Sequence, residues 1–415
     1  MSEGGTSKGK LVVLAMFALA VVFALGFVFW KPGASAPTAT AEPSASGAHP
    51  GAANAPNAPN APPTPAAQTT RISFMYGSEK KTWLVEALSR FAKAHPEITV
   101  DVAEKGSLDM VQAMLDQNAR PTLISPADDV ALNLLTSDWR QKYGSDLVAT
   151  DGAAKAVPLV LTPLVLVAWE DRARVISTNQ QELTFKRLHA AVDSPKGWPG
   201  VGGKPDWGFV KLGHTNPTRS NSGLQALILM AYEFQKKRAG LEIKDVIDEK
   251  FQTFVKGLER GVTKFGDSSG TFMEEMVLYG PSKYDVVVTY ENLAIQHIPN
   301  AQGRWGNLRV FYPSQTMWSS HPIAVLQGDW VTAGQRAAAQ TLIAFLREKP
   351  EQQRALALGF RPANPEVNVL GENADSPFQR AQAFGVRTDL GSVVEAPPGP
   401  VVRNLMEMWA RQVGR

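Results

Sequence analysis

Short apolar strands alternate with helical segments from Arg71 onwards, and this alternation limits the possible folds more than any other feature of the chain. Apolar residues in the longer segments recur at intervals of three and four, which is typical of helices packed on one face. Three strand–helix pairs follow one another: Ile72–Tyr76 with Trp83–His95, Ile98–Ala103 with Leu108–Gln117, and Thr122–Ser125 with Val130–Lys142. Such alternation predicts βαβ units, and hence a parallel sheet with helices on both faces.

A second α/β series follows the first. Its predicted elements are helices at Phe185–Val192, Gly223–Lys237 and Ile243–Gly261, strands at Phe209–Leu212 and Asp285–Tyr290, and later helices at Thr332–Glu348, Glu351–Leu358 and Val401–Gln412. Two such series in a chain of 415 residues indicate two α/β lobes of ordinary size.

Two apolar stretches connect the series. Val157–Trp169 contains Pro158 and Pro163, which lack the N–H that a central strand needs, so we expect a connecting or edge strand there. Ser320–Leu326 is the second expected crossing. The predicted lobes are residues 71–165 with 320–415, and residues 166–319. Two crossings would leave a cleft between the lobes.

The N-terminal region contains a long apolar stretch, Leu11–Trp30, without a charged side chain. Its twenty residues would span about 30 Å as a helix, the thickness of a bilayer core. A cleavable signal has a shorter apolar region, so we expect a transmembrane signal anchor. The small residues at Ala39–Ala41 match a cleavage site and keep a cleaved signal open.

Basic residues around this stretch set its expected orientation. Lys8 and Lys10 precede it and Lys31 follows it, which places a tail of residues 1–10 in the cytoplasm and the remainder outside. Residues 31–70 are rich in Pro and Ala and repeat Asn-Ala-Pro, so they form a predicted disordered, extended linker.

Composition excludes several classes of function. The formal net charge is only +3 and no Lys/Arg block occurs, so we expect no nucleic-acid partner. The chain has no cysteine, which excludes disulfides, thiolate metal sites and cysteine catalysis. The six histidines are scattered and no phosphate-binding loop motif occurs, so we expect neither a metal site nor a cofactor.

Polar side chains crowd the turn within Phe209–Phe234, FVKLGHTNPTRSNSGLQALILMAYEF. Thr215, Asn216 and Ser220–Ser222 lie between a predicted strand and a predicted helix. A helix start presents unpaired N–H groups and partial positive charge, so this turn could hold an anion or a hydroxylated ligand. An ordinary N-cap turn is the alternative, because Ser, Thr and Asn are common caps.

Similar polar turns follow other predicted strands. They contain Gly77 and Ser78, then Ser125, then Ser268, and finally Tyr290 and Glu291. Ligands of open α/β sheets bind beyond the carboxyl ends of strands. The recurrence in both series therefore predicts one shared cleft.

Ser268 also lies within Gly266–Gly270, which matches the G-x-S-x-G pattern of serine hydrolases. Asp285 or Glu291 could supply the acid, and His297 or His321 the base. The residues before the motif form only a weak strand, and the HGGG motif of such enzymes is missing. A serine hydrolase using Ser268 is therefore an alternative hypothesis.

Four stretches together resemble a known family: GHTNPTRSNSG with its helix, YDVVVTYENLAI, SHPIAVLQGDWVTAGQRAAAQTLIAFL and ALALGFRPANP. From Arg71 to Arg415 the chain is similar to bacterial extracellular solute-binding proteins, in particular to the branch that groups with molybdate- and phosphate-type binding proteins. The resemblance implies a two-lobed flytrap fold with two crossover strands, no catalysis, and delivery of a solute to an ABC-type permease. It also implies a monomer.

By position, the resemblance implies a set of ligand contacts: Gly77, Ser78, Ser125, Thr215, Asn216, Ser220, Asn221, Ser222, Ser268, Tyr290 and Glu291. Asp128, Asp129 and Glu291 would bring negative charge to this site unless Lys80 or Arg219 offsets it. The sign of the ligand's charge therefore stays open, and a cationic or polyhydroxylated ligand is allowed.

Our main hypothesis is a solute-binding protein anchored in the inner membrane by a single helix, with its folded part on the periplasmic side. Its expected partners are a small molecule or ion, a permease, and the membrane. The remaining alternative is a ligand-sensing or interaction module that has the same fold and no role in transport.

Overall fold

The computed structural model describes residues 69–414, apart from 117–118, 178–181, 267, 372–374 and 392. The predicted cytoplasmic tail, the predicted anchor at Leu11–Trp30 and the predicted linker as far as residue 68 lie outside the described residues. Within the described ranges, no helix is both long enough and apolar enough to cross a membrane.

The first sheet has the strand order β2-β1-β3-β10-β4. Its strands are β1 (Thr70–Tyr76), β2 (Ile98–Glu104), β3 (Leu123–Ser125), β4 (Val157–Pro158) and β10 (Pro322–Val325). β1 pairs in parallel with both β2 and β3, as predicted. The predicted parallel sheet is confirmed for β1, β2 and β3 only, because β10 runs antiparallel to β3 and β4. β10 enters this sheet from the second sheet rather than through a helical crossover.

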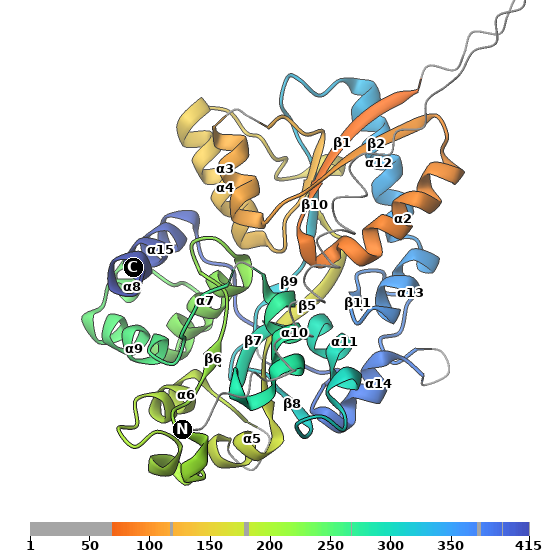
Figure 1. Cartoon of the computed structure of the whole chain (residues 1–415). Helices are drawn as coiled ribbons and strands as arrows, with labels where there is room; N and C mark the ends of the chain where they lie inside the picture. Colours follow the sequence, from red (N-terminus) through yellow and green to blue (C-terminus); the bar gives the residue numbers. More distant parts are fainter. Residues whose placement is uncertain are drawn as a thin grey trace, which may run out of the picture. The chain divides into compact units, whose positions relative to one another are not determined.

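Helices cover both faces of the first sheet (Figure 1). They are α2 (Lys81–Ala94) and α12 (Ala333–Arg347) on one side, and α3 (Ser107–Leu115) and α4 (Asp129–Tyr143) on the other. Successive side chains of β1 point to opposite faces, so Phe74 packs with the α2 and α12 side and Met75 with the α3 and α4 side. These boundaries agree with the predicted helices to within a few residues.

The second sheet has the order β11-β5-β7-β6, and β8 and β9 also pair with β5. Its strands are β5 (Val160–Trp169), β6 (Leu212–Gly213), β7 (Val286–Tyr290), β8 (Leu308–Phe311), β9 (Trp318–Ser319) and β11 (Arg361–Pro362). β5 is antiparallel to β7, β8, β9 and β11, whereas β6 and β7 are parallel.

Val157–Trp169 is a connecting strand, as expected, since it passes from β4 in the first sheet into β5 in the second. The alternative of an edge strand is wrong, because β5 has partners on both sides in the second sheet. Pro163 is tolerated because pairing with β7 begins only at Leu164 and the facing strand β9 has two residues. The missing N–H of Pro163 therefore interrupts no long ladder.

Several other elements surround the second sheet. They are α5 (Glu170–Ile176), α6 (Phe185–Val192), α7 (Asn221–Gln235), α8 (Ile243–Val246), α9 (Glu249–Glu259), α10 (Ser269–Tyr279), α11 (Glu291–Ala301), α13 (Lys349–Ala357), α14 (Pro377–Ala381) and α15 (Gly399–Gln412). The single helix predicted over Ile243–Gly261 is divided, because Asp248 caps a new helix by accepting from the Phe251 N–H at 2.8 Å. The predicted strand at Phe209–Leu212 reduces to β6.

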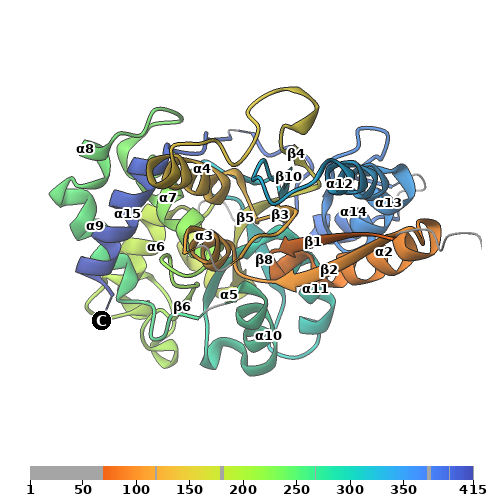
Figure 2. The same cartoon turned by 90° about the horizontal axis from the view of Figure 1, so that it is seen from above.

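Both predicted crossings connect the two sheets. The chain passes from β4, which pairs with β10, directly into β5, and it returns from β9, which pairs with β5, to β10. α15 packs against α4 on one side and against α8 and α9 on the other (Figure 2). The division of the chain into lobes by residue range stays a prediction.

Candidate functional site

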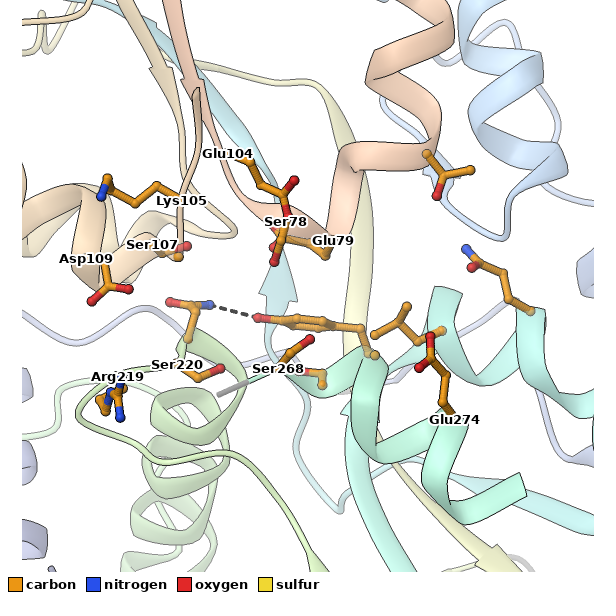
Figure 3. A pocket seen from close by; sticks show the side chains of 18 of the residues that line it. Ser78, Glu79, Glu104, Lys105, Ser107, Asp109, Arg219, Ser220, Ser268 and Glu274 are labelled. Atoms are coloured by element: carbon orange, nitrogen blue, oxygen red, sulfur yellow. Dashed lines mark hydrogen bonds between the residues drawn. The ribbon is translucent and has the colours of Figure 1, made fainter. Parts of the chain in front are cut away.

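A cavity of about 720 Å³ is lined by residues from elements of both sheets. Strand ends and helix starts supply most of its wall, as the rule for ligand sites in α/β sheets predicts. In Figure 3, Glu104, Lys105, Ser107 and Asp109 approach from the β2–α3 side, while Arg219 and Ser220 approach from the start of α7.

Five helical segments begin at this cavity. They are the 3-10 turn Ser78–Lys80 that leads into α2, and the helices α3, α7, α10 and α11. Within the described part of the chain, none of these starts is capped by the side chain of its N-cap residue, whereas α4, α6, α9, α12 and α14 are capped in that way. A start without such a cap leaves partial positive charge and backbone N–H donors near the cavity. The start of α11 is the exception, because the Asn292 N–H donates to Thr162 Oγ1 at 3.1 Å.

A chain of hydroxyl groups joins the starts of α7 and α10. The Oγ of Ser222 lies 2.7 Å from Thr215 Oγ1 and 2.5 Å from Ser269 Oγ. Ser220 Oγ lies 3.3 Å from the same Ser222 oxygen. Ser222 and Thr215 are buried behind the cavity wall, so these hydrogen bonds hold the two helix starts together.

The inner wall contains a network around Asn221 and Tyr290. The Asn221 Nδ2 donates to the Tyr290 hydroxyl at 3.1 Å, the bond drawn in Figure 3. Gln225, one helical turn after Asn221, donates to Asp128 at 2.6 Å. Burial raises the pKa of Asp128 to about 6, although hydrogen bonds from Asn221, the Ala131 N–H and Gln225 counteract this rise.

A buried cation lies beside this network. The Lys80 Nζ donates to Glu79 Oε1 at 2.9 Å, to the Pro126 carbonyl at 3.3 Å and to His321 Nδ1 at 3.1 Å. Burial, together with the Lys80 charge, lowers the pKa of His321 to about 4. Burial alone would raise the pKa of Glu79, but Lys80 and His321 hold it well below its ordinary value. Lys80 is thus engaged by Glu79.

The rim of the cavity carries charges of both signs. Its acids are Glu79, Glu104, Asp109 and Glu274, and its bases are Lys105 and Arg219. Glu104 is paired with Lys81 at 2.8 Å, so two of the four carboxylates have a lysine partner. The cavity therefore combines backbone donors at its wall with carboxylate acceptors at its rim.

The predicted ligand contacts divide into two groups. Those that line the cavity are Ser78, Ser220, Asn221, Ser268 and Tyr290, and those outside its lining are Gly77, Ser125, Thr215, Asn216, Ser222 and Glu291. Ser125 is buried, accepts from the Gly77 N–H at 3.0 Å through its carbonyl, and donates to the His321 carbonyl through its hydroxyl. Ser125 therefore lies behind the cavity wall rather than on its surface.

Glu291 is fully buried in an ion pair rather than exposed to the cavity. Its two carboxylate oxygens accept from Arg361 Nε and Nη2, each at 2.7 Å, and the Tyr312 hydroxyl donates to the same group. Burial raises the pKa of Glu291, and Arg361 opposes that rise. The negative charge expected from Glu291 is therefore matched internally.

Sequence reasoning missed part of the wall. Gly106, Ser107 and Asp109 at the start of α3 follow β2, so the strand-end rule that identified Ser78 applies to them as well. Gln296 and His297 line the cavity from α11, a helix that was not predicted. The apolar spacing after Glu291 was the available signal for that helix.

Three of the four hydrolase partners expected for Ser268, namely Asp285, Glu291 and His321, are engaged elsewhere. Asp285 accepts hydrogen bonds from Arg172, Trp198 and the Lys211 N–H. His297 shares the cavity with Ser268, but among the described residues no hydrogen bond joins Ser268 to a histidine. The described residues also contain no cluster of three or more metal-ligating side chains.

Comparison with known proteins adds two sequence findings. The model of the family described as bacterial extracellular solute-binding protein matches residues 72–361. The thiosulfate-binding protein of Pseudomonas aeruginosa is 31% identical over 181 residues, which are 42% of this chain and 49% of that protein. The chain thus spans about half the length of this curated relative.

Solved structures share the fold at low identity. The sulfate-binding protein SubI from Mycobacterium tuberculosis H37Rv is 17% identical, with a TM-score of 0.51 over 83% of this chain and 99% of that chain. The substrate-binding protein of an ABC transporter from Agrobacterium tumefaciens gives a TM-score of 0.53 at 15% identity, over 84% and 95%. Maltose-bound MalE3 from T. maritima gives 0.53 at 13% identity, over 82% and 98%. These likenesses show a two-sheet α/β fold in common.

Proposed function

This chain belongs to the bacterial extracellular solute-binding proteins, and from that membership we propose that it captures a small polar solute in the cavity between its sheets and presents it to an ABC-type permease. The observation that supports the proposal most directly is the convergence at one cavity of the starts of α3, α7 and α10 and of the turn that leads into α2, none of which is capped by the side chain of its N-cap residue. Such starts bind anionic groups without any chemical step.

An anionic group on the solute fits the proposed site best. Backbone N–H donors at the wall and the cations Lys105 and Arg219 at the rim favour negative charge. The name of the thiosulfate-binding relative is consistent with an anion. The carboxylates of the rim disfavour a bare, highly charged anion, so we propose a solute that presents one anionic group and further polar groups.

The cellular setting is also part of the proposal. We propose that Leu11–Trp30 anchors the chain in the inner membrane and that residues 31–70 hold the folded part on the periplasmic side. Residues 71–165 with 320–415 would form one lobe and 166–319 the other. The chain would act as a monomer that reaches its permease through the linker.

The test is native mass spectrometry of the freshly purified full-length chain, followed by thermal-shift screening against anions, amino acids and sugars. A bound solute should raise the melting temperature, because a ligand that binds only the folded state stabilises it. Ser78→Ala, at the cavity, should weaken the shift, whereas Ser282→Ala on the exposed surface should leave it unchanged.

Two results would redirect the assignment. If no solute class changes the melting temperature and no mass is retained, the capture proposal fails and an interaction module gains support. If a serine-reactive phosphonate labels Ser268 and Ser268→Ala abolishes the labelling, the hydrolase hypothesis gains support instead.

A further inference from the structure

One polar atom in the cavity wall lacks a partner. Asn221 is only 4% exposed and lines the cavity, yet among the described residues its Oδ1 accepts no hydrogen bond. Buried acceptors in folded proteins are nearly always satisfied, and an unsatisfied one is costly. A bound molecule that supplies a donor would satisfy this atom.

The surroundings of Asn221 fix the orientation of its amide. The Nδ2 donates to the Tyr290 hydroxyl and also toward the buried carboxylate of Asp128. Turning the amide over would place its carbonyl oxygen against that carboxylate, and two acceptors repel each other. Asp128 is held in place by the Ala131 N–H and by Gln225, so it acts as a positioning residue for Asn221.

We propose that this site selects an anion that also carries a hydrogen-bond donor, with the anionic group at the helix starts and an O–H or N–H group on Asn221 Oδ1. This inference rests on the proposed function and narrows its substrate class. A fully deprotonated oxyanion such as sulfate or thiosulfate has no proton to donate at neutral pH. It would leave the Asn221 acceptor unsatisfied and would also meet the carboxylates of the rim.

The rim supports the same conclusion independently. Asp109 and Glu274 extend the acceptor character of the cavity beyond Asn221 (Figure 3). Acceptors on both the wall and the rim favour a solute with more than one donor, such as a hydroxy acid or an amino acid. The donor-rich helix starts and the acceptor groups thus recognise different parts of one molecule.

The experiment compares matched solutes by isothermal titration calorimetry of the full-length chain in mild detergent at pH 7. The pairs are sulfate with phosphate, propionate with lactate, and ethanesulfonate with taurine, in which only the second member carries a donor. We expect the donor-bearing member of at least one pair to bind about tenfold or more tightly, because a site built around a hydrogen bond rejects the analogue that lacks it.

Two variants test whether Asn221 is responsible. Asn221→Ala should reduce the preference to threefold or less, and Ser78→Ala should weaken both members of a pair equally. If Asn221→Ala does not fold, Asp128→Asn serves instead, since it removes the carboxylate that orients the amide and should lower the preference while binding persists.

The outcomes separate this inference from the function on which it rests. Binding without preference for the donor-bearing member, or a preference that survives both variants, would overturn the inference alone. Binding by none of the six probes, in a chain whose native mass spectrum is also free of ligand, would overturn the proposed function and the inference together.

Discussion

At the scale of single residues, Asp128 and His321 are buried with pKa values displaced in opposite directions. Burial raises the pKa of Asp128 to about 6, so the folded state holds that proton more tightly than the unfolded state. Its contribution to stability is present at low pH and is lost as pH rises through about 6. Burial lowers the pKa of His321 to about 4, and its contribution is present above the unfolded value and lost as pH falls toward 4.

These opposed titrations predict a specific effect of Asp128→Asn. In the variant, the titration of Asp128 no longer offsets that of His321. We therefore expect the difference in free energy of unfolding, variant minus wild type, to rise with pH between about 4 and 6, by up to about 1.4 kcal/mol per pH unit. Urea denaturation at several pH values measures it. His321→Asn, in which asparagine tolerates the left-handed backbone at this position (φ 42°), should give a difference of the opposite slope. Differences that do not vary with pH would contradict the assignment.

Glu291 illustrates what a sequence can and cannot tell about one residue. Its position after a strand predicted a polar residue at the site, but its partner Arg361 lies 70 residues later, and no local pattern links the two. Pairing over such a separation depends on how β11 docks beside β5. Asn221 was identifiable because it lies in a turn crowded with polar residues between a predicted strand and a predicted helix.

Glu291→Gln should therefore destabilise the fold strongly. The change leaves the buried Arg361 guanidinium without its counter-charge, which costs about 3 kcal/mol or more. Guanidinium chloride denaturation gives the loss in unfolding free energy. Asp101→Asn breaks the exposed pair with Arg71 and is the control, for which we expect little change. Equal effects of the two substitutions would contradict the structural role of Glu291.

At the scale of elements, the start of α7 is held against the preceding turn by a glycine. A Cβ on Gly223 would lie 2.2 Å from the Thr215 carbonyl oxygen, a backbone atom that cannot move aside easily. Gly223→Ala should therefore destabilise the chain by about 1–3 kcal/mol and weaken solute binding, because the helix start must shift. Thermal denaturation and titration calorimetry measure the two effects.

The matched control lies in α12. A Cβ on Gly334 would meet nothing within 4 Å, so Gly334→Ala should stabilise the chain by about 0.4–1 kcal/mol through reduced freedom of the unfolded chain. If both alanines stabilise, the contact between Gly223 and the turn is looser than the structure indicates.

Periodicity predicted most helices well but set several boundaries wrongly. α6 has the predicted bounds because Thr184 caps it and its apolar spacing is regular. α11 was missed because Tyr290 ends a buried strand and Glu291 begins the helix without an intervening turn. A local pattern cannot mark a boundary at which both elements are buried.

At the scale of the folded unit, the two sheets and their crossings were predictable but the pairing of strands in the second sheet was not. The apolar run of Val157–Trp169 suggested a crossing, and its prolines suggested an edge. β5 is instead central, since partners from distant parts of the chain, β7, β8, β9 and β11, pair along it. Which distant strands meet is decided by tertiary packing, and a single sequence contains little of that information.

The cavity lies between elements of both sheets, so a solute that contacts both walls should favour the arrangement in which both contacts form. Because the chain has no cysteine, spin labels can be attached at two introduced cysteines only. Val85 on α2 and Leu278 on α10 are each 54% exposed, and their helices supply Thr82 and Glu274 to the cavity. Double electron–electron resonance on Val85→Cys/Leu278→Cys measures the distance between the two labels. This distance distribution should become shorter and narrower when the solute identified by native mass spectrometry is added.

The control pair for this measurement is Val85→Cys/Val102→Cys, which places both labels on elements of the first sheet. Its distribution should not change, because a solute that shifts one wall relative to the other leaves distances within a wall as they were. A shift in both pairs would indicate a general tightening of the fold, and no shift in either pair would mean that the solute binds a cavity whose walls are already in their final positions. A change confined to the pair that spans the cavity would support capture by relative movement of the two walls. Under the proposed function, a permease could use this movement to distinguish the occupied protein from the empty one.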